Sequence, residues 1–188
     1  MEKDNSDKRI IKPPFTDEII KSLNAGDMVY ISGTIYTARD AAHKLLFEMI
    51  ERGEDMPFDF KGQAVYYAGP APAKPGKPIG SVGPTTGGRM DAYSPTLIAN
   101  GLKVMIGKGT RNESVVKGIT EHNGVYFAAI GGAAALMAKC VISSEIIAFE
   151  DLGTEAIRKL EVKELPVVVA IDYQGNDVYK KAIEEYRR

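Results

Sequence analysis

The stretch GPTTGGRMDAYSP, at residues 83–95, holds the residue types best suited to binding a small anion. Two adjacent hydroxyls, Thr85 and Thr86, precede a Gly-Gly pair and then Arg89. Glycines let a backbone approach a ligand closely and leave N–H groups that can form a small anion nest. The planar guanidinium of Arg89 suits bidentate binding of a carboxylate. A dicarboxylate is the ligand that matches these groups, and a capped turn with a solvated arginine is the alternative that composition alone leaves open.

A second candidate cation, Arg39, lies in the segment TIYTARDAAHK, at residues 34–44. We expect a strand-to-helix junction there, with Arg39 in the first turn of the helix. Such junctions are where open α/β sheets gather ligands. A cation in the first turn is unfavourable against the helix dipole, which indicates a role other than helix stability. A salt bridge to the neighbouring Asp40, or a surface position, is the alternative.

The third candidate is Lys108, which lies between Gly107 and Gly109 just after an expected strand. A lysine presented from such a loop can act as a point charge for a carboxylate or as a proton-relay group. Arg111 is interpreted as part of the same basic edge. The alternative for Lys108 is a solvated turn lysine.

Metal ligands are scarce, because the chain has one cysteine, Cys140, and two histidines, His43 and His122. A [4Fe–4S] cluster takes three or four thiolates, so this chain cannot hold one by itself. Zinc needs several ligands at suitable spacing, and neither histidine has a second ligand beside it. We therefore expect no metal site within the chain. Cys140 is interpreted as a small buried hydrophobe, and the histidines as helix-surface or hydrogen-bonded residues.

The segment AAIGGAAALMAKC, at residues 128–140, places Gly131-Gly132 at the expected start of a helix after a strand. Backbone N–H groups there can lie near an anion. The segment lacks the G-x-G-x-x-G spacing, so it does not indicate dinucleotide binding. Close packing of the helix on the sheet is the favoured interpretation.

Composition excludes several classes of partner. The chain has 188 residues, with 24 basic and 25 acidic side chains and a net charge of -1, which argues against binding nucleic acid through bulk charge. Its longest uncharged apolar run, residues 125–137, is too short to cross a bilayer. Its N-terminus lacks the apolar segment of a secretory signal. We therefore expect no nucleic-acid or membrane partner and a cytoplasmic location.

Strands and helices alternate along the chain, which predicts an α/β fold. Strands are expected at residues 28–31, 64–68, 104–106, 125–130, 140–143, 146–149 and 167–171. Helices are expected at residues 16–24, 37–53, 94–101, 112–122, 132–138 and 179–188, with a helical turn at 154–160. Thr37 is the expected cap of the second helix, in a variant of the capping box with Asp40.

Two segments are expected to be irregular. Residues 1–15 are polar and then proline-containing, which is typical of a mobile or docking arm. Residues 69–88 are rich in proline and glycine. A loop of about twenty residues is uncommon inside a compact domain, and this one ends in the polar motif at 83–95, so we interpret it as functional.

Together, GPTTGGRMD, TARDAAHK, the GKG after a strand and IGGAAAL resemble the C-terminal domain, or separate β subunit, of class I fumarases and L-tartrate dehydratases. The resemblance runs from about residue 27 to about residue 180, and Thr-Thr-x-Gly-Arg-Met-Asp is its specific element. It implies a swivelling β/β/α domain with mixed sheets and flanking helices. It also implies an N-terminal arm and short helix at 1–26 and an iron–sulfur hydro-lyase β-type catalytic domain at 27–188.

The resemblance further implies reversible hydration of fumarate to (S)-malate. The [4Fe–4S] cluster would be held by three cysteines of an α subunit, in a hetero-oligomer. Arg39, Arg89 and Lys108 would bind the substrate carboxylates. Thr86 would support binding and Thr85 would be the catalytic base, a role for which a hydroxyl needs nearby cations or the field of the cluster. A tartrate dehydratase β subunit, or a non-catalytic carboxylate-binding or scaffold module, is the alternative.

Overall fold

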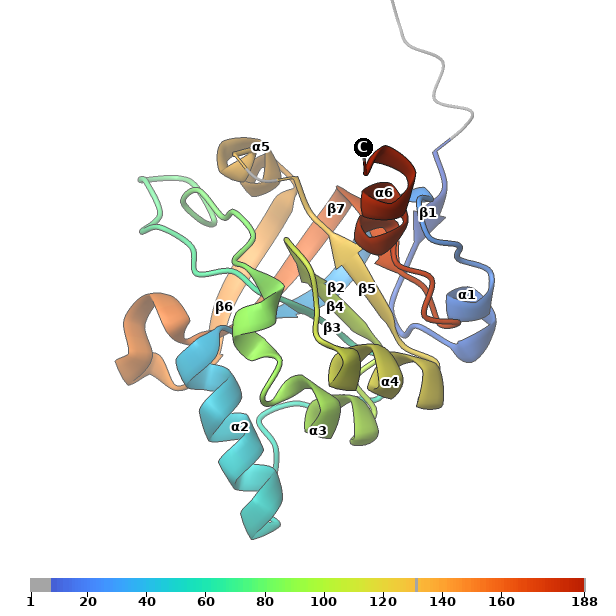
Figure 1. The fold of residues 1–188 in the computed structure, drawn as a ribbon. Coiled ribbons are helices and arrows are strands. Elements are labelled where there is room, and N and C mark those ends of the chain that lie inside the picture. The colour runs from blue at the N-terminus through green and yellow to red at the C-terminus, as the bar shows by residue number, and fades with distance from the viewer. Residues whose placement is uncertain (1–7, 131, 188) are drawn as a thin grey trace, which may run out of the picture.

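The computed structural model describes residues 8–130 and 132–187, which form a mixed α/β fold (Figure 1). The strands are β1 (Ile10–Ile11), β2 (Met28–Thr37), β3 (Ala64–Tyr66), β4 (Val104–Gly107), β5 (Val125–Ala128), β6 (Val141–Ala148) and β7 (Ile157–Ile171). The α-helices are α1 (Asp17–Lys21), α2 (Asp40–Arg52), α3 (Ser94–Ala99), α4 (Glu113–Glu121), α5 (Ala134–Lys139) and α6 (Val178–Tyr186). Two short 3₁₀ helices are η1 (Gly87–Met90) and η2 (Glu150–Glu155). The predicted α/β class with flanking helices is confirmed.

The sheet closes on itself. Its strand order is β1-β2-β3-β4-β5-β7-β6, and β7 also pairs with β2. β2 to β5 are parallel neighbours, whereas β7 runs antiparallel to both β5 and β2. Parallel neighbours need crossover connections, which α2, the η1–α3 segment and α4 provide. The result is a ring of β2, β3, β4, β5 and β7, with β1 and β6 attached to it.

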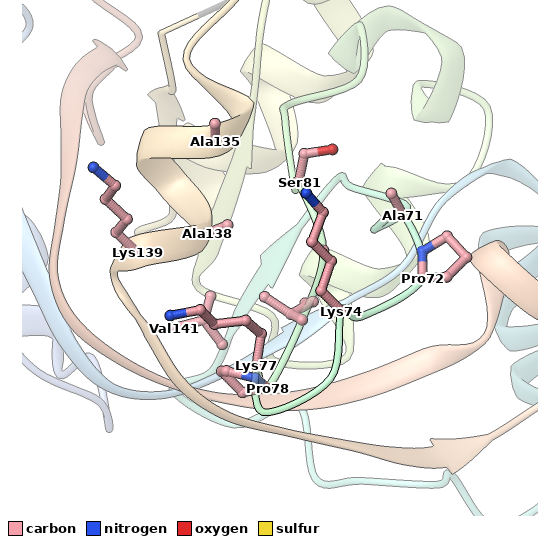
Figure 2. A pocket seen from close by; sticks show the side chains of 12 residues that line it. Ala71, Pro72, Lys74, Lys77, Pro78, Ser81, Ala135, Ala138, Lys139 and Val141 are labelled. Atoms are coloured by element: carbon pink, nitrogen blue, oxygen red, sulfur yellow. The ribbon is translucent and has the colours of Figure 1, made fainter.

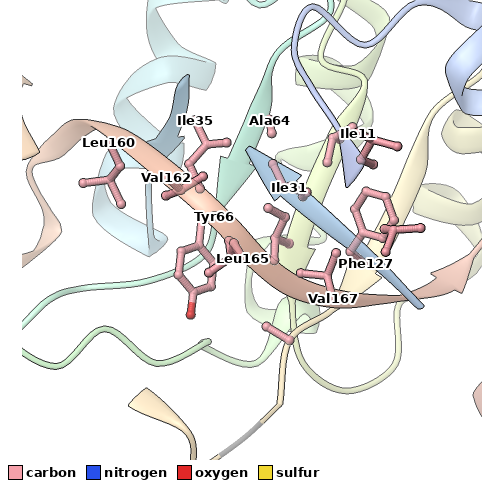
Figure 3. Close-up of a cluster of buried hydrophobic side chains, with 14 of the residues drawn as sticks. Ile11, Ile31, Ile35, Ala64, Tyr66, Phe127, Leu160, Val162, Leu165 and Val167 are labelled. Carbon is pink, nitrogen blue, oxygen red and sulfur yellow. The ribbon is translucent and has the colours of Figure 1, made fainter. Parts of the chain in front are cut away.

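Strand residues alternate between two hydrophobic clusters. In β4, Val104 and Ile106 belong to the cluster on the inner face of the ring, and Met105 belongs to a second cluster. In β5, Phe127 faces the first cluster and Tyr126 the second. Figure 3 shows inner-face side chains from β2, β3, β5 and β7 pointing toward one another. The second cluster lies between the sheet and α2, α3 and α4. Burial on both faces explains why β3, β4 and β5 are short apolar runs in the sequence.

The start of α4 agrees with the sequence prediction, whereas the start of α2 does not. The predicted start of α4 is confirmed, because Oδ1 of Asn112 accepts the N–H of Val115 at 3.0 Å. The predicted capping box at Thr37 is wrong. Thr37 is the last residue of β2 and its hydroxyl accepts the N–H of Arg158 at 3.1 Å. Arg39 takes the cap position of α2 instead, so it precedes the first turn rather than lying in it.

The C-terminal third differs most from the sequence prediction. The two short strands expected at 140–143 and 146–149 are one strand, β6. The helical turn expected at 154–160 is wrong, because η2 ends at Glu155 and β7 begins at Ile157. β7 pairs with β2 along one edge and with β5 and β6 along the other. Strand pairing on both edges overrides the local preference of the segment, which is all that a sequence window shows.

The N-terminal segment is attached to the sheet from residue 8 onward. β1 lies parallel to β2, with Ile10 opposite Tyr30. Phe15 is buried, and its N–H donates to the carbonyl of Gly62 at 2.7 Å. Residues 8–15 are therefore part of the fold rather than a detached arm, and residues 1–7 lie outside the described part of the chain. The division of the chain after Gly26 stays a prediction.

The long loop at residues 69–88 is held to the core at several points. The hydroxyl of Tyr66 donates to the carbonyl of Val82 at 2.9 Å, and the N–H of Val82 donates to the carbonyl of Ala134 at 3.1 Å. An isolated bridge joins Ala68 to Pro84. These bonds return the loop to the end of β3, so the motif at 83–95 begins beside that strand.

Candidate active site

The candidate residues lie near the carboxyl ends of the parallel strands. β2, β3, β4 and β5 run in the same direction, so these ends share one edge of the sheet. Arg39 follows β2 by two residues, and Lys108 follows β4 at once. Ligands of open α/β sheets gather at this edge. The topology therefore supports the predicted location of the site.

Backbone hydrogen bonds hold the two threonines against the end of β4. The N–H of Thr85 donates to the carbonyl of Tyr67 at 2.6 Å, and the carbonyl of Thr85 accepts the N–H of Lys108 at 3.1 Å. The N–H of Gly87 donates to the carbonyl of Lys108 at 2.8 Å, so Thr86 and Lys108 form a parallel bridge. The structure thus brings Thr85, Thr86 and Lys108 together. Thr85 is half-buried, whereas Thr86 and Lys108 are exposed.

The expectation that the N–H groups of this loop point outward is wrong for three of them. The N–H groups of Thr85, Gly87 and Arg89 all donate to carbonyls of the chain. Gly87 is needed for close packing instead, because a Cβ there would lie 2.5 Å from the hydroxyl of Tyr126 and 2.9 Å from Cδ of Arg111. Anion binding by this loop therefore depends chiefly on side chains.

Arg89 lies on η1, which contacts α2. Its Nε donates to Oδ1 of Asp40 at 2.8 Å, and its side chain is 51% exposed. The sequence left open a salt bridge between Asp40 and its neighbour Arg39. The observed partner of Asp40 is Arg89, so this ion pair connects the two arginine-bearing segments.

Arg39 is held between η2 and the end of β3. Its Nη2 lies 3.4 Å from Oε1 of Glu155, and the N–H of Ala41 donates to Oε2 of the same carboxylate at 2.8 Å. A Cβ at Gly69 would lie 2.5 Å from Nη1 of Arg39, so the guanidinium packs directly on the backbone there. A Cβ there would also lie 2.9 Å from the backbone carbonyl oxygen of Thr154, which cannot swing away as a side chain can, so the site favours glycine. The segments carrying all the predicted site residues adjoin one another at this edge.

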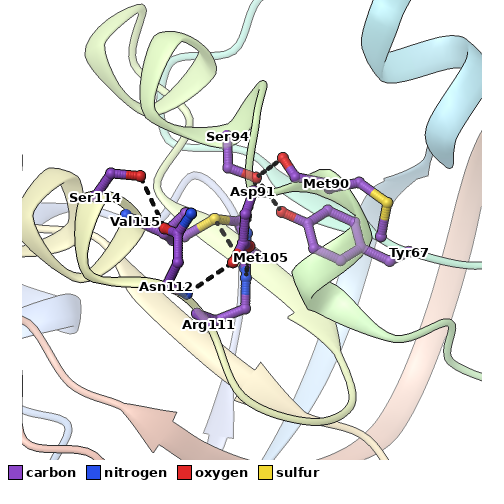
Figure 4. A network of polar contacts seen from close by, with 9 residues as sticks. All are labelled: Tyr67, Met90, Asp91, Ser94, Met105, Arg111, Asn112, Ser114 and Val115. Atoms are coloured by element: carbon purple, nitrogen blue, oxygen red, sulfur yellow. Dashed lines mark hydrogen bonds and ion pairs between the residues drawn. The ribbon is translucent and has the colours of Figure 1, made fainter.

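Arg111 is a buried structural residue. Its Nε donates to Oδ1 of Asp91 at 2.6 Å and its Nη2 to Oγ of Ser94 at 2.8 Å (Figure 4). The guanidinium carbon lies 5.3 Å from the ring centroid of Tyr67 and 4.7 Å from that of Tyr126, in cation–π geometry. Burial disfavours the charged form, but Tyr67 and Asp91 raise the pKa of Arg111 above its ordinary value. The interpretation of Arg111 as part of the basic edge is therefore wrong.

The Arg111 network joins two of the sequence motifs. Asp91 belongs to the motif at 83–95, and its second oxygen accepts the N–H of Asn112 at 2.7 Å. Arg111 and Asn112 belong to the loop between β4 and α4. The carboxylate of Asp91 thus fixes the threonine- and arginine-bearing loop relative to the loop that carries Lys108.

His43 is fully buried, and so it is not a helix-surface residue. Its Nδ1 lies 2.9 Å from the carbonyl of Arg39, and its ring packs edge-on against Tyr67. Burial, helped by the charge of Arg111, lowers the pKa of His43 to about 4. The ring is therefore neutral near pH 7, and its contact with the carbonyl of Arg39 helps to hold the backbone of that residue in place. His122 is exposed.

The neutral state of His43 predicts a loss of stability in mild acid. Its folded pKa, about 4, lies below the usual unfolded value, so between about pH 6.5 and pH 4 only the unfolded chain takes up the proton. The contribution of neutral His43 to the free energy of unfolding is complete above that window. Within the window it decreases by about 1.4 kcal/mol for each unit by which the pH is lowered. Urea unfolding should show that His43→Gln removes about 2 kcal/mol of the loss between about pH 7 and pH 5. The control His122→Gln should keep the wild-type loss, and an equal loss in both variants would contradict the prediction.

The described residues do not form a ligand set for an iron–sulfur cluster. Within residues 8–130 and 132–187, no three His, Cys, Asp or Glu side chains are grouped to hold a metal ion. Cys140 is half-buried, and its Sγ lies 3.8 Å from the carbonyl of Leu136 and 3.7 Å from that of Glu164. Burial, followed by the charge of Glu164, raises the pKa of the Cys140 thiol. A thiol of this kind is not preset as a thiolate ligand.

The Gly-Gly segment after β5 contributes less than the sequence suggests. Gly131 lies outside the described residues, and α5 begins at Ala134 rather than at Gly132. A Cβ at Gly132 would meet nothing within 4 Å. The expected close packing of helix on sheet is therefore not found at Gly132.

One large hollow of the surface is lined by other residues than the candidate site residues. A cavity of about 720 Å³ opens between the long loop and α5, with Lys74, Lys77 and Lys139 around an apolar floor (Figure 2). None of the five predicted site residues lines it. Arg89 and Lys108 instead face solvent at the open edge. A small ligand held there would remain exposed on one side.

Sequence reasoning missed three acidic residues that organise this edge, namely Asp40, Asp91 and Glu155. Asp91 lies within the Thr-Thr-x-Gly-Arg-Met-Asp motif, which was the available signal for it. Asp40 was considered as a partner of the preceding arginine and as part of a capping box with Thr37, but not as a partner of Arg89. Glu155 carried no local signal, because it meets Arg39 only through the fold.

Fold and site together define an α/β domain that carries several cationic side chains at the carboxyl edge of its parallel strands. The chain matches the family described as Fumarase C-terminus over residues 2–182. It therefore belongs to the family of fumarase C-terminal domains. Within the described residues, none of the helices combines the length and the apolar character that crossing a membrane requires.

The relatives of the chain are hydro-lyases. It is 41% identical over 157 residues to "Fumarate hydratase class I, anaerobic" of Escherichia coli (strain K12), covering 82% of this chain and 29% of that protein. It is 36% identical over 192 residues to "Putative fumarate hydratase class I" of Geobacillus stearothermophilus, covering 96% and 36%. It is 38% identical over 172 residues to "Putative L(+)-tartrate dehydratase subunit beta" of Methanocaldococcus jannaschii, covering 88% of each. The chain thus spans about a third of these fumarate hydratases and most of the β subunit.

Proposed function

We propose that this chain is the β subunit of a heteromeric iron–sulfur hydro-lyase that reversibly hydrates fumarate to (S)-malate. The observation that carries the proposal is the junction of three separate segments at one sheet edge, through the Thr86–Lys108 bridge and the Asp40–Arg89 ion pair. Membership of the fumarase C-terminal family supports the reaction class. The match to most of a protein named as a β subunit supports a separate chain.

Each predicted site residue has a role in this proposal. Arg39, Arg89 and Lys108 bind the two substrate carboxylates, with the guanidinium groups suited to bidentate contacts and the ammonium to a point contact. Thr86, exposed beside Lys108, supports binding. Thr85 is the catalytic base. Its backbone is fixed on both sides by hydrogen bonds to Tyr67 and Lys108, so its side chain starts from a fixed point of the site.

A threonine hydroxyl is a very weak acid, so its use as a base depends on its surroundings. Cations near a hydroxyl favour its ionised form and lower its pKa. The backbone N–H of Lys108 donates to the backbone carbonyl of Thr85, and Arg89 lies four residues along the same loop, so both cations are carried by segments that adjoin Thr85. In the proposed site, the cationic side chains at this edge are what this chain itself contributes to the environment of the Thr85 hydroxyl.

The remaining parts of the site would come from another chain. We propose that an α subunit holds the [4Fe–4S] cluster through three cysteines and that the two chains form a hetero-oligomer in the cytoplasm. When bound, such a cluster supplies a Lewis acid. The lack of a suitable ligand set in the described residues fits this division of labour. So does the exposure of Arg89 and Lys108, because a docked surface would enclose the ligand between the subunits.

An L-tartrate dehydratase β subunit is the second candidate function. It is favoured by the relative from Methanocaldococcus jannaschii, whose printed name is a tartrate dehydratase subunit and which this chain matches over 88% of both lengths. The cations described above suit either dicarboxylate. A non-catalytic carboxylate-binding or scaffold module is the alternative outside the enzyme class.

Mixing the subunits tests the proposal. The purified chain is assayed anaerobically with fumarate, malate and tartrate, alone and after reconstitution with the cluster-bearing α subunit. We expect no turnover by the chain alone, because it supplies carboxylate contacts but no Lewis acid. We expect turnover of fumarate and malate by the mixture. Turnover by the chain alone would refute the divided site, and an inactive mixture would favour the non-catalytic module.

A further inference from the structure

The carboxylate of Asp40 connects the two arginine-bearing segments. Asp40 is the first residue of α2 and directly follows Arg39, while Arg89 lies on η1. Oδ1 of Asp40 accepts the Nε–H of Arg89 at 2.8 Å. Its other oxygen, Oδ2, is buried and has no hydrogen-bond partner in the described part of the chain. The polar contact of the Asp40 side chain in these residues is thus directed at Arg89.

The geometry of this contact leaves the fork of Arg89 free. Asp40 takes the Nε–H donor, and the Nη atoms donate to no other residue within 8–130 and 132–187. The Nη groups form the end of the guanidinium that can bind a carboxylate. Because the Arg89 side chain is 51% exposed, this end is accessible to a ligand.

The first turn of α2 is also fixed from the opposite direction. Glu155 accepts the N–H of Ala41 at 2.8 Å and lies 3.4 Å from Nη2 of Arg39. The same turn therefore carries the anchor of Arg89 and the backbone of Arg39. A half-exposed ion pair contributes little to stability. Orientation of the two guanidinium groups explains the arrangement better than stabilisation does.

We propose that Asp40 is a positioning residue, which orients Arg89 toward a substrate carboxylate and sets its spacing from Arg39. This inference rests on the proposed function, since it assumes that Arg89 binds substrate. Without Asp40, Arg89 stays charged but rotates freely, so ordering it on binding becomes costly. The effect is a higher KM, with kcat changed less.

A double-mutant cycle in the reconstituted enzyme tests the role. Asp40→Ala should lower kcat/KM about tenfold, mainly through KM, and should have less than about a twofold effect in an Arg89→Ala background. Asp40→Asn should stay within about threefold of wild type, because its amide oxygen still accepts the Nε–H. The matched control is Glu54→Ala, which breaks the exposed Arg52–Glu54 contact of 2.6 Å and should leave kcat/KM unchanged.

Succinate titration of the purified chain, followed by NMR, gives a readout that does not need turnover. The dissociation constant should rise about tenfold in Asp40→Ala and remain at the wild-type value in Glu54→Ala. An unchanged KM and dissociation constant in Asp40→Ala would overturn the positioning role, as would losses that multiply in the double variant. If the purified chain binds succinate in a way that depends on Asp40 but the mixture with the α subunit is inactive, the proposed function is refuted and the positioning role is kept. Absence of both binding and turnover would overturn both.

Discussion

Replacing Arg111 by methionine is expected to lower the free energy of unfolding by about 3–5 kcal/mol. The Arg111 side chain is 0% exposed and that of Asp91 is 9% exposed, with 2.6 Å between Nε and Oδ1. Methionine replaces the aliphatic part of the arginine side chain but carries no charge, so the variant leaves Asp91 buried without its counter-charge. It also removes the cation between the rings of Tyr67 and Tyr126. Urea unfolding followed by circular dichroism measures the loss.

A second variant separates charge burial from packing. Asp91→Leu combined with Arg111→Met removes both charges, so it should be more stable than the sum of the single losses predicts. The control is Lys117→Met, whose side chain is 73% exposed and lies 3.7 Å from Glu121. It should change stability by less than about 0.5 kcal/mol. A loss below about 1 kcal/mol in Arg111→Met would show that the buried pair behaves like an exposed one.

Features governed by neighbouring residues were predictable from the sequence. Asn112 caps the helix that its spacing predicts, and Lys108 comes directly after a buried strand as expected. Arg39 and Lys108 each come just after a strand, as the sequence predicts. Parallel strands bring their carboxyl ends together whatever their order, so a candidate site at this edge can be proposed without knowing the pairing order.

Features governed by distant residues were not predictable. β7 extends to Ile157 because β2 and β6 pair with it on opposite edges, and the segment itself gives no such signal. Arg111 looked like its neighbour Lys108, yet it turns inward to meet Asp91 twenty positions earlier. The sign of a charge is visible in a sequence, but its burial depends on the fold. The ion pair between Arg89 and Asp40 could not be predicted from the sequence either, because only the fold brings the two residues together.

Arg89→Ala is expected to lower kcat/KM of the reconstituted enzyme by about 100- to 1000-fold, or roughly 3–4 kcal/mol of transition-state stabilisation. In the proposed site, its Nη groups contact a substrate carboxylate that the docked subunit shields from water. Removing the cation leaves that carboxylate enclosed without a partner, which is more costly than losing a solvated contact. Arg89→Lys should recover only part of the loss, because an ammonium cannot make the bidentate contact.

Arg52 is the matched control for this prediction, because its side chain has a similar exposure and its Nε also contacts a carboxylate. The side chain of Arg52 is 53% exposed and that of Arg89 is 51% exposed, and each uses Nε to contact a carboxylate, at 2.6 and 2.8 Å. Both alanine variants should therefore lose less than about 1 kcal/mol of folding stability. Only Arg89→Ala should lose activity, since Arg52 lies at the far end of α2 from the site. Equal kcat/KM values for the two variants would show that Arg89 does not bind the substrate. The Asp40–Arg89 ion pair would then have no role in connecting a substrate site to Arg39.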